Sequence, residues 1–222
     1  MKHKKRRKKQ RPVKLILKYS VLLLLVMWLF SIFHSYRDRM KDAIDDILHP
    51  TKQVGAVDVT ELFLTPNEYS RPQTELKKVN GIVIHYTANP GSTAENNRDY
   101  FEGLKDSHAT YASSHYIIGL EGEIIQCIPL DEVAYASNER NEDTISIEVC
   151  HEDETGRFNK ETHQSLVKLV AWLCGEYNLK EEDIIRHYDV TGKCCPKYYV
   201  EHEDKWIQFK TEVFAYIEQL GQ

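Results

Sequence analysis

The chain has 222 residues, which allows one domain of ordinary size with additional segments. Its 41% of hydrophobic and 10% of aromatic residues suffice for a packed core. The net charge of −5 is unevenly spread: residues 1–18 carry ten Lys and Arg and no acidic residue, which leaves 19 basic against 34 acidic residues in the remainder. Such an acidic body lacks the basic footprint that phosphate binding needs, so no nucleic-acid partner is expected.

An uncharged apolar stretch, residues 19–33, follows the basic head. Its 15 residues are fewer than the ~20 that usually span a bilayer, but residues 15–17 extend it if Lys18 reaches the interface. A polybasic run before such a stretch is typical of a membrane insertion signal, and the positive-inside rule places that run in the cytoplasm. We therefore predict a basic cytoplasmic tail (1–18), a transmembrane helix as anchor (19–33) and an extracellular globular body.

This topology makes the protein a single-pass protein of the cell membrane. The alternative is that residues 19–33 form a buried helix of a soluble domain. A cleaved signal peptide is disfavoured, because no small-x-small cleavage site follows the apolar stretch.

Residues 34–60 are predicted to form a juxtamembrane stalk, and residues 61–222 to form the globular body. In the stalk, Met40, Ile44 and Ile47 have helical spacing, which predicts a short amphipathic helix before His49-Pro50.

Five cysteines lie in the body, at positions 127, 150, 174, 194 and 195. An odd number in an exported domain suggests that at least one thiol has another role. The adjacent Cys194 and Cys195 are poor disulfide partners for each other on geometric grounds. The pairing of the remaining cysteines is left open.

Five short segments of the body have the composition and patterning of β-strands. Glu121-Gly122 separates two of them and predicts a tight hairpin. The predicted strands are residues 80–87, 114–120, 123–128, 144–150 and 184–187.

Three helices are expected among these strands. A capping box of Ser92 and Glu95 begins the first, and Asn159 can cap the second. An apolar stripe near the C-terminus predicts the third. The helices are predicted to run to about Ser107, to about Tyr177, and from Trp206 to Leu220. Strands interleaved with helices predict an α/β fold with a central mixed β-sheet flanked by helices.

Glu148 lies inside the predicted strand 144–150, on the opposite face from Ile145 and Ile147. A carboxylate inside an apolar strand is costly to bury without a partner. Either the strand lies at an edge with Glu148 in water, or Glu148 faces a cleft where burial raises its pKa toward the range of a general base. Spacing alone does not decide between the two.

A metal site is suggested by residues 186–196, which combine His187, Lys193 and Cys195 around a glycine turn, and by His85 in the strand 80–87. Two imidazoles and a thiolate suit a zinc ion that keeps a fourth position for water, which favours a hydrolase over a structural zinc site. Each signal alone is weak. A histidine in a buried strand is more often a hydrogen-bonded core residue, and His and Cys eight residues apart do not match a zinc finger.

Four segments carry a resemblance to a known family: GIVIHYT, SSHYIIGLEGEIIQCIP, NEDTISIEVC and RHYDVTGKCCP. They occur in this order in bacterial and phage N-acetylmuramoyl-L-alanine amidases, a zinc-dependent family that is related to peptidoglycan recognition proteins. The resemblance covers about residues 64–195. It implies the fold of these amidases, Zn²⁺ as the cofactor and peptidoglycan as the partner.

By this resemblance, His85, His187 and Cys195 match the three zinc ligands. Glu148 matches the catalytic glutamate, and Lys193 matches the lysine that precedes the third ligand by two residues.

Three further positions follow from the same resemblance. His115 matches a recurrent histidine of the hairpin strand, expected to support a ligand or to face the substrate. Ser114 stands where some relatives have a catalytic tyrosine, so that role is absent or is taken over by Glu148. Cys194 stands where relatives often have Asn, and it can compete with Cys195 for zinc.

The implied reaction is cleavage of the amide bond between the N-acetylmuramoyl lactyl group and L-alanine of the stem peptide. Zinc-activated water would attack, with Glu148 as general base and Lys193 near the oxyanion. Two alternatives are a non-catalytic peptidoglycan-binding module, and a zinc amidase that acts on another acyl-amino acid bond. The presence of all three ligand positions disfavours the binding module.

Overall fold

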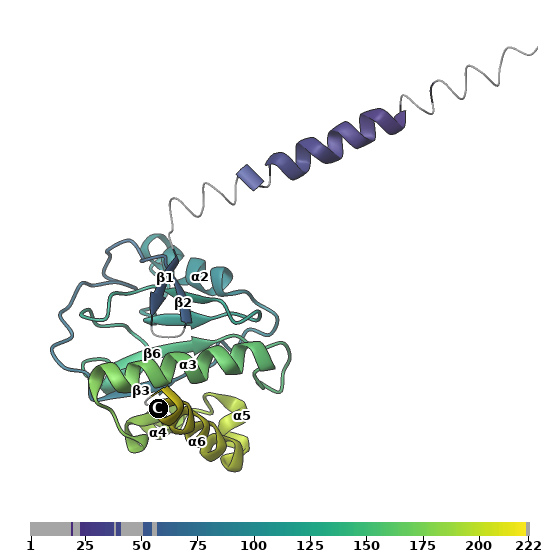
Figure 1. Ribbon diagram of the computed structural model, residues 1–222. Helices are drawn as coiled ribbons and strands as arrows, with labels where there is room; N and C mark the ends of the chain where they lie inside the picture. The colour runs from purple at the N-terminus through teal and green to yellow at the C-terminus, as the bar shows by residue number, and fades with distance from the viewer. Residues whose placement is uncertain (1–18, 20–22, 38, 41–50, 55–56, 221–222) are drawn as a thin grey trace, which may run out of the picture. The chain divides into compact units, whose positions relative to one another are not determined.

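The computed structural model describes residues 19, 23–37, 39–40, 51–54 and 57–220. The chain divides into two compact units, Met1–Leu48 and His49–Gln222 (Figure 1). The predicted basic tail and most of the predicted amphipathic helix of the stalk lie outside the described residues.

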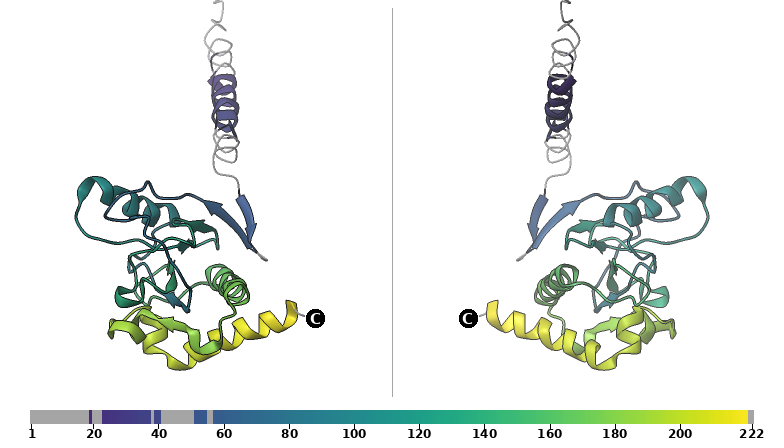
Figure 2. Two further views of the ribbon diagram at one scale, coloured as in Figure 1. Left: turned by 90° about the vertical axis from the view of Figure 1, so that its left-hand side faces the viewer. Right: turned by 90° about the vertical axis from the view of Figure 1, so that its right-hand side faces the viewer.

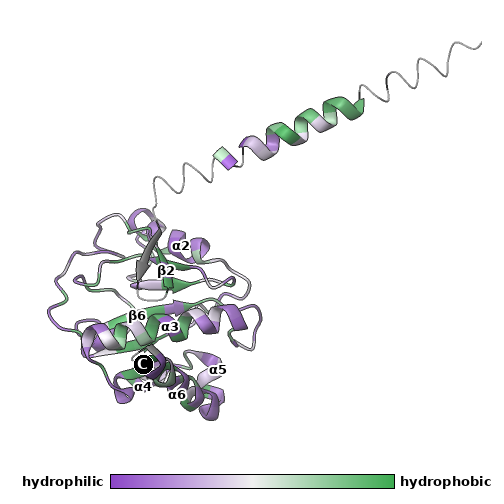
Figure 3. Cartoon of the chain, in the orientation of Figure 1, coloured by the Kyte–Doolittle hydropathy of each residue, from purple (hydrophilic) through white to green (hydrophobic). Residues whose placement is uncertain are grey.

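The first unit contains the helical residues 23–37, a large part of which is hydrophobic (Figure 3). The apolar side chains between Leu23 and Phe33 are exposed. Within the part of the chain that is described, no helix is both long enough and apolar enough to cross a membrane. This finding contradicts the predicted transmembrane helix over residues 19–33, and with it the single-pass membrane topology. Among the described residues, the unbroken helical stretch 23–37 extends about 22 Å at ~1.5 Å per residue, against a hydrocarbon core of ~30 Å.

The second unit is built on a seven-stranded mixed sheet in the order β1-β2-β5-β4-β6-β3-β7. β4 and β5 form an antiparallel hairpin, whereas β6, β3 and β7 run parallel. The strands are β1 (Thr51–Val54), β2 (Val57–Glu61), β3 (Gly81–Ile84), β4 (Tyr116–Ile118), β5 (Ile124–Gln126), β6 (Thr144–Val149) and β7 (Ile184–Arg186). The prediction of an α/β domain with a central mixed sheet is therefore confirmed.

β1 and all but the last residue of β2 lie within residues 34–60, which we expected to form a stalk. β2 pairs in parallel with β5, which places Val59 opposite Ile124 and buries it completely. Two strands this short, with several polar residues, carry little periodic signal. Only their pairing with each other and with β5 in the folded structure identifies them as strands of the sheet.

Helices cover both faces of the sheet (Figure 2). On one face, Phe101 and Leu104 of α2 pack with Ile117 and Ile125 in one buried cluster. On the other face, the apolar side of α3 packs with β3 and β6, and α6 packs against α3. The helices are α2 (Ala94–Ser107), α3 (Lys160–Tyr177), α4 (His187–Thr191), α5 (Lys197–Glu201) and α6 (Glu203–Leu220), with the 3₁₀ helices η1 (Asn138–Arg140) and η2 (Glu181–Asp183).

The helix starts agree with the sequence in one case and differ in another. Asn159 caps α3 and accepts a hydrogen bond from the backbone N–H of Thr162, as expected. The cap of α2 is Thr93, which forms a capping box with Asn96. Ser92 instead donates its hydroxyl to the carbonyl of Asn89, which closes the preceding turn.

Candidate metal centre and active site

The candidate site lies at the carboxyl end of three neighbouring parallel strands. His85 directly follows β3, and His187 directly follows β7. β6 lies on the other side of β3, and Ile84 pairs with Ile147 in register, next to Glu148. Because parallel strands end at the same edge of a sheet, residues a hundred positions apart meet there.

The structure brings the three predicted metal ligands together. His85, His187 and Cys195 are all buried, and their ligand atoms lie within 4.8 Å of one another. The Cys195 Sγ atom lies 3.8 Å from Nδ1 of His85. The two imidazole rings meet edge to face with their centroids 4.7 Å apart. Cys194 is exposed and stands outside this group.

The outer nitrogens of both histidines are held by one loop. His85 Nε2 lies 3.1 Å from the Ser137 hydroxyl, and His187 Nε2 donates to Oδ1 of Asn138 at 3.2 Å. Asn138 has a φ of 52°, in the left-handed region that Asn tolerates better than most residues. A partner at one ring nitrogen fixes the tautomer, so that the other nitrogen presents a lone pair.

This arrangement leaves Nδ1 of His187 buried without a hydrogen-bond partner among the described residues. A buried polar atom without a partner is costly, and a metal ion shared with His85 and Cys195 would satisfy it. Two imidazoles and one thiolate are a donor set that suits Zn²⁺ with a fourth position open. The residues present therefore fit a catalytic zinc ion.

The electrostatics of the three groups agree with this assignment. Burial lowers the pKa of His85 well below its ordinary value, and the charges of His187 and Lys193 lower it further. Burial, with Lys193, also lowers the pKa of His187, so both imidazoles stay neutral, as ligands must be. Burial raises the pKa of the Cys195 thiol to about 12. A thiolate at this position therefore needs a cation beside it.

Glu148 lies beside the metal ligands with its Oε2 atom buried and without a hydrogen-bond partner among the described residues. Burial raises its pKa to about 8, and the charge of Lys193 opposes that rise. Of the two interpretations of this strand residue, the structure favours the carboxylate that faces a buried site, since β6 is an interior strand.

His115 and Ser114 are buried, and both are hydrogen-bonded to other parts of the protein. His115 is 1% exposed; its Nε2 donates to the carbonyl of Glu132 at 2.9 Å, and its Nδ1 accepts from the backbone N–H of Ser146 at 3.0 Å. Burial lowers the pKa of His115 to about 4. Ser114 is fully buried and donates its hydroxyl to the carbonyl of Ser146. Because both ring nitrogens are hydrogen-bonded, His115 links Ser146 of β6 to the backbone at Glu132.

Sequence reasoning missed Ser137 and Asn138, which hold the two histidines. They lie in an irregular loop around η1, so no periodicity points to them. It also missed Arg186, which is 6% exposed and precedes His187. The guanidinium of Arg186 contacts Asp189 at 2.8 Å and Glu203 at 2.5 Å.

A family model described as N-acetylmuramoyl-L-alanine amidase matches residues 75–198. The chain belongs to this amidase family. The matched region contains β3, β6 and β7 and the five residues predicted as metal ligands or catalytic groups: His85, Glu148, His187, Lys193 and Cys195.

Curated members of the amidase family are similar to most of this chain. The N-acetylmuramoyl-L-alanine amidase CwlL of Bacillus licheniformis is 39% identical over 170 residues, which are 71% of this chain and 47% of the relative. A probable N-acetylmuramoyl-L-alanine amidase of the same organism is 37% identical over 169 residues, 71% of this chain and 47% of the relative. The chain spans about half the length of these relatives.

The solved structure of PlyL has the same fold as the amidase body described here. It superposes with a TM-score of 0.61 at 26% identity and covers 71% of this chain and 97% of that chain. The expected fold of the body is thus confirmed.

Proposed function

We propose that this protein is a zinc-dependent peptidoglycan amidase. In this proposal, it cleaves the amide bond between the lactyl group of N-acetylmuramic acid and L-alanine of the stem peptide. Membership in the amidase family supports the reaction. The observation that carries the mechanism is the buried trio of His85, His187 and Cys195 with Glu148 beside it.

A zinc ion bound by the trio would act as a Lewis acid and lower the pKa of a water in its open position to ~7. Glu148 would accept the proton of that water as the water oxygen bonds to the amide carbonyl carbon. Glu148 would then return the proton to the amide nitrogen as the C–N bond breaks, which releases the amine. Burial raises the pKa of Glu148 toward the operating pH, the range that suits a group that first takes and then returns a proton.

Lys193 would stabilise the negative charge that develops on the carbonyl oxygen. Its charge acts on Glu148 and on both histidines, which places it within electrostatic reach of the site. Loss of such a group typically costs about a hundred- to thousandfold in rate.

The test is mass spectrometry of purified peptidoglycan incubated with the full chain. Free stem peptides that begin at L-alanine are expected; a zinc chelator should abolish them and added zinc should restore them. The Glu148→Gln variant should keep its zinc and lose at least a hundredfold in turnover. Equal turnover of this variant and the parent would rule out Glu148 as the base. Protein that binds the intact polymer without releasing peptides would instead indicate a binding module.

A further inference from the structure

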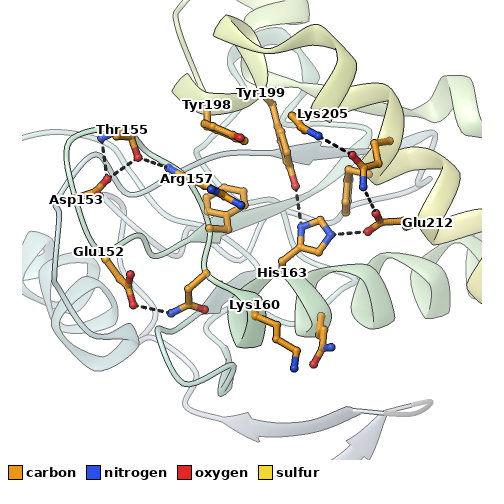
Figure 4. Close-up of a pocket in the computed structure, with 15 residues that line it drawn as sticks. Glu152, Asp153, Thr155, Arg157, Lys160, His163, Tyr198, Tyr199, Lys205 and Glu212 are labelled. Carbon is orange, nitrogen blue, oxygen red and sulfur yellow. Dashed lines mark hydrogen bonds and ion pairs between the residues drawn. The ribbon is translucent and has the colours of Figure 1, made fainter.

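Figure 4 shows a cavity beside α3 and the C-terminal helices α5 and α6. Its volume is about 620 Å³. It is lined by the loop between β6 and α3, the first turns of α3, and residues of α5 and α6. Neither Glu148 nor any of the three predicted metal ligands lines it.

Both walls of this cavity continue directly from the candidate active site. The β6–α3 loop follows Glu148, and Tyr198 lies three residues after Cys195. Three residues span at most about 11 Å, so the backbone of Tyr198 lies within that distance of the backbone of Cys195. Lys197 also links α5 to the β6–α3 loop, because it donates to the carbonyl of Glu154 at 2.6 Å. A peptide of four residues extends about 13 Å, which is longer than the separation of these two backbone positions.

The carboxylates that line the cavity already accept hydrogen bonds from the protein. Glu152 accepts from the side-chain amide of Asn159 at 3.2 Å. Glu212 accepts from Nε2 of His163 at 2.6 Å, while Nδ1 of His163 lies 3.1 Å from the hydroxyl of Tyr199. Figure 4 shows this chain from Tyr199 through His163 to Glu212 as dashed lines. Each of these two acids thus has at least one donor from the protein itself.

Two of the three cationic side chains that line the cavity, unlike its acids, have no hydrogen-bond or ion-pair partner among the described residues. Among residues 57–220, Arg157 is the one arginine whose guanidinium has no carboxylate partner in the structure. Its guanidinium lies 5.8 Å from the ring centre of Tyr198, over a wall of the cavity. The ammonium of Lys160 also has no acceptor among the described residues, and both side chains line the cavity. The cavity thus offers unused N–H donors with positive charge, which suit a carboxylate.

The stem peptide of peptidoglycan has such a carboxylate. Its amino end is blocked, because it is joined to the lactyl group, and its other end carries a free carboxylate. We propose that the cavity receives the terminal carboxylate of the stem peptide whose lactyl amide lies at the metal centre, with Arg157 and Lys160 as its partners. This inference rests on the proposed function. It makes the protein selective for stem peptides that end in a free carboxylate.

The test compares two N-acetylmuramoyl tetrapeptides of identical sequence, one ending in a carboxylate and the other in a carboxamide. The parent is expected to cleave the carboxylate form with a kcat/KM about tenfold higher, since a charge-assisted hydrogen bond is lost with the carboxamide. The double variant R157Q/K160Q should lower kcat/KM on the carboxylate form alone, so that the ratio falls to about one. Lys78→Gln is the matched control. Lys78 is exposed and precedes β3, at the opposite end from the metal centre, so this variant should keep the parent's ratio.

Equal cleavage of both peptides by the parent, or an unchanged ratio in the double variant, overturns the inference and leaves the proposed function standing. If the parent cleaves neither peptide, the proposed function fails, and calorimetric titration with the same peptides decides the inference. Weaker binding of the carboxylate form by the double variant then supports it, and equal binding overturns it.

Discussion

Asn138 accepts a hydrogen bond from Nε2 of His187 at 3.2 Å, and Nδ1 of His187 has no partner among the described residues. One contact thus sets which nitrogen of this histidine is presented to a ligand. The residue that makes it lies 49 positions earlier in the chain.

Asn138→Gly removes this side chain while it keeps a residue that tolerates the positive φ. Zinc affinity is expected to fall about ten- to a hundredfold, the usual cost of losing a partner of a metal ligand. Competition titration with a chromophoric chelator measures it. Asn178→Gly is the matched control, because Asn178 has a φ of 53° as the C-cap of α3, while the hydrogen bonds to the two histidines come from Ser137 and Asn138. Unchanged zinc affinity in Asn138→Gly would remove Asn138 from the site.

Cys195→Ser and Cys194→Ser separate the two adjacent thiols. Cys195 is buried with the histidines, whereas Cys194 is exposed, so only the first substitution should release zinc. Metal analysis of the purified variants decides the ligand. Zinc retained in Cys195→Ser and lost in Cys194→Ser would assign the thiolate to Cys194.

Arg186→Met tests the contacts that hold the segment of His187. The guanidinium is nearly buried and contacts Asp189 and Glu203, and it lies 5.3 Å from the ring centre of Trp206. Its loss should lower the free energy of unfolding by about 2 kcal/mol, because Asp189 and the carbonyl of Tyr199 lose hydrogen bonds from a nearly buried guanidinium. Urea denaturation measures the change. Arg140→Met removes a similar pair with Asp143, but that pair is 32% and 30% exposed, and the expected loss is under about 1 kcal/mol. Equal losses in both variants would show that the buried contacts of Arg186 contribute no more to stability than the more exposed pair of Arg140 and Asp143.

Glu102 makes the stability of the body depend on pH. Burial would raise its pKa, but hydrogen bonds from Lys105 and Thr65 outweigh burial and lower it to about 2. A depressed carboxyl pKa stabilises the folded state above the ordinary value of 4.5, and this contribution is lost as the pH falls toward 2.

Glu102→Gln should therefore destabilise the protein by about 1–2 kcal/mol at pH 7, after allowance for solvent screening, and by much less near pH 3. Urea denaturation at the two pH values measures the difference. Glu142→Gln, at an exposed position, is the control and should show no such dependence. A constant difference between Glu102→Gln and the parent at both pH values would contradict this assignment.

Much of the body could be predicted from the sequence, because its local signals agree with its tertiary environment. The apolar run around Ile82 and Ile84 is a buried strand, and Asn159 caps α3, as the residue types indicate. The family motifs pointed to His85, His187 and Cys195 without any knowledge of distance. The prediction of a transmembrane helix at 19–33 was wrong, because no helix among the described residues is both long enough and apolar enough to cross a membrane.

The tertiary structure decided what surrounds those residues. The parallel register of β3 with β6 and β7 brings His85 beside Glu148 and His187, and a sequence does not state strand order. Ser137 and Asn138 reach the histidines from a loop that has no periodicity. Likewise, the sequence does not reveal that Arg157 lacks a carboxylate partner, because this depends on which residues lie near it in space. Local residue types determine elements and candidate ligands, whereas hydrogen bonds and charges act over distances that only the folded chain defines.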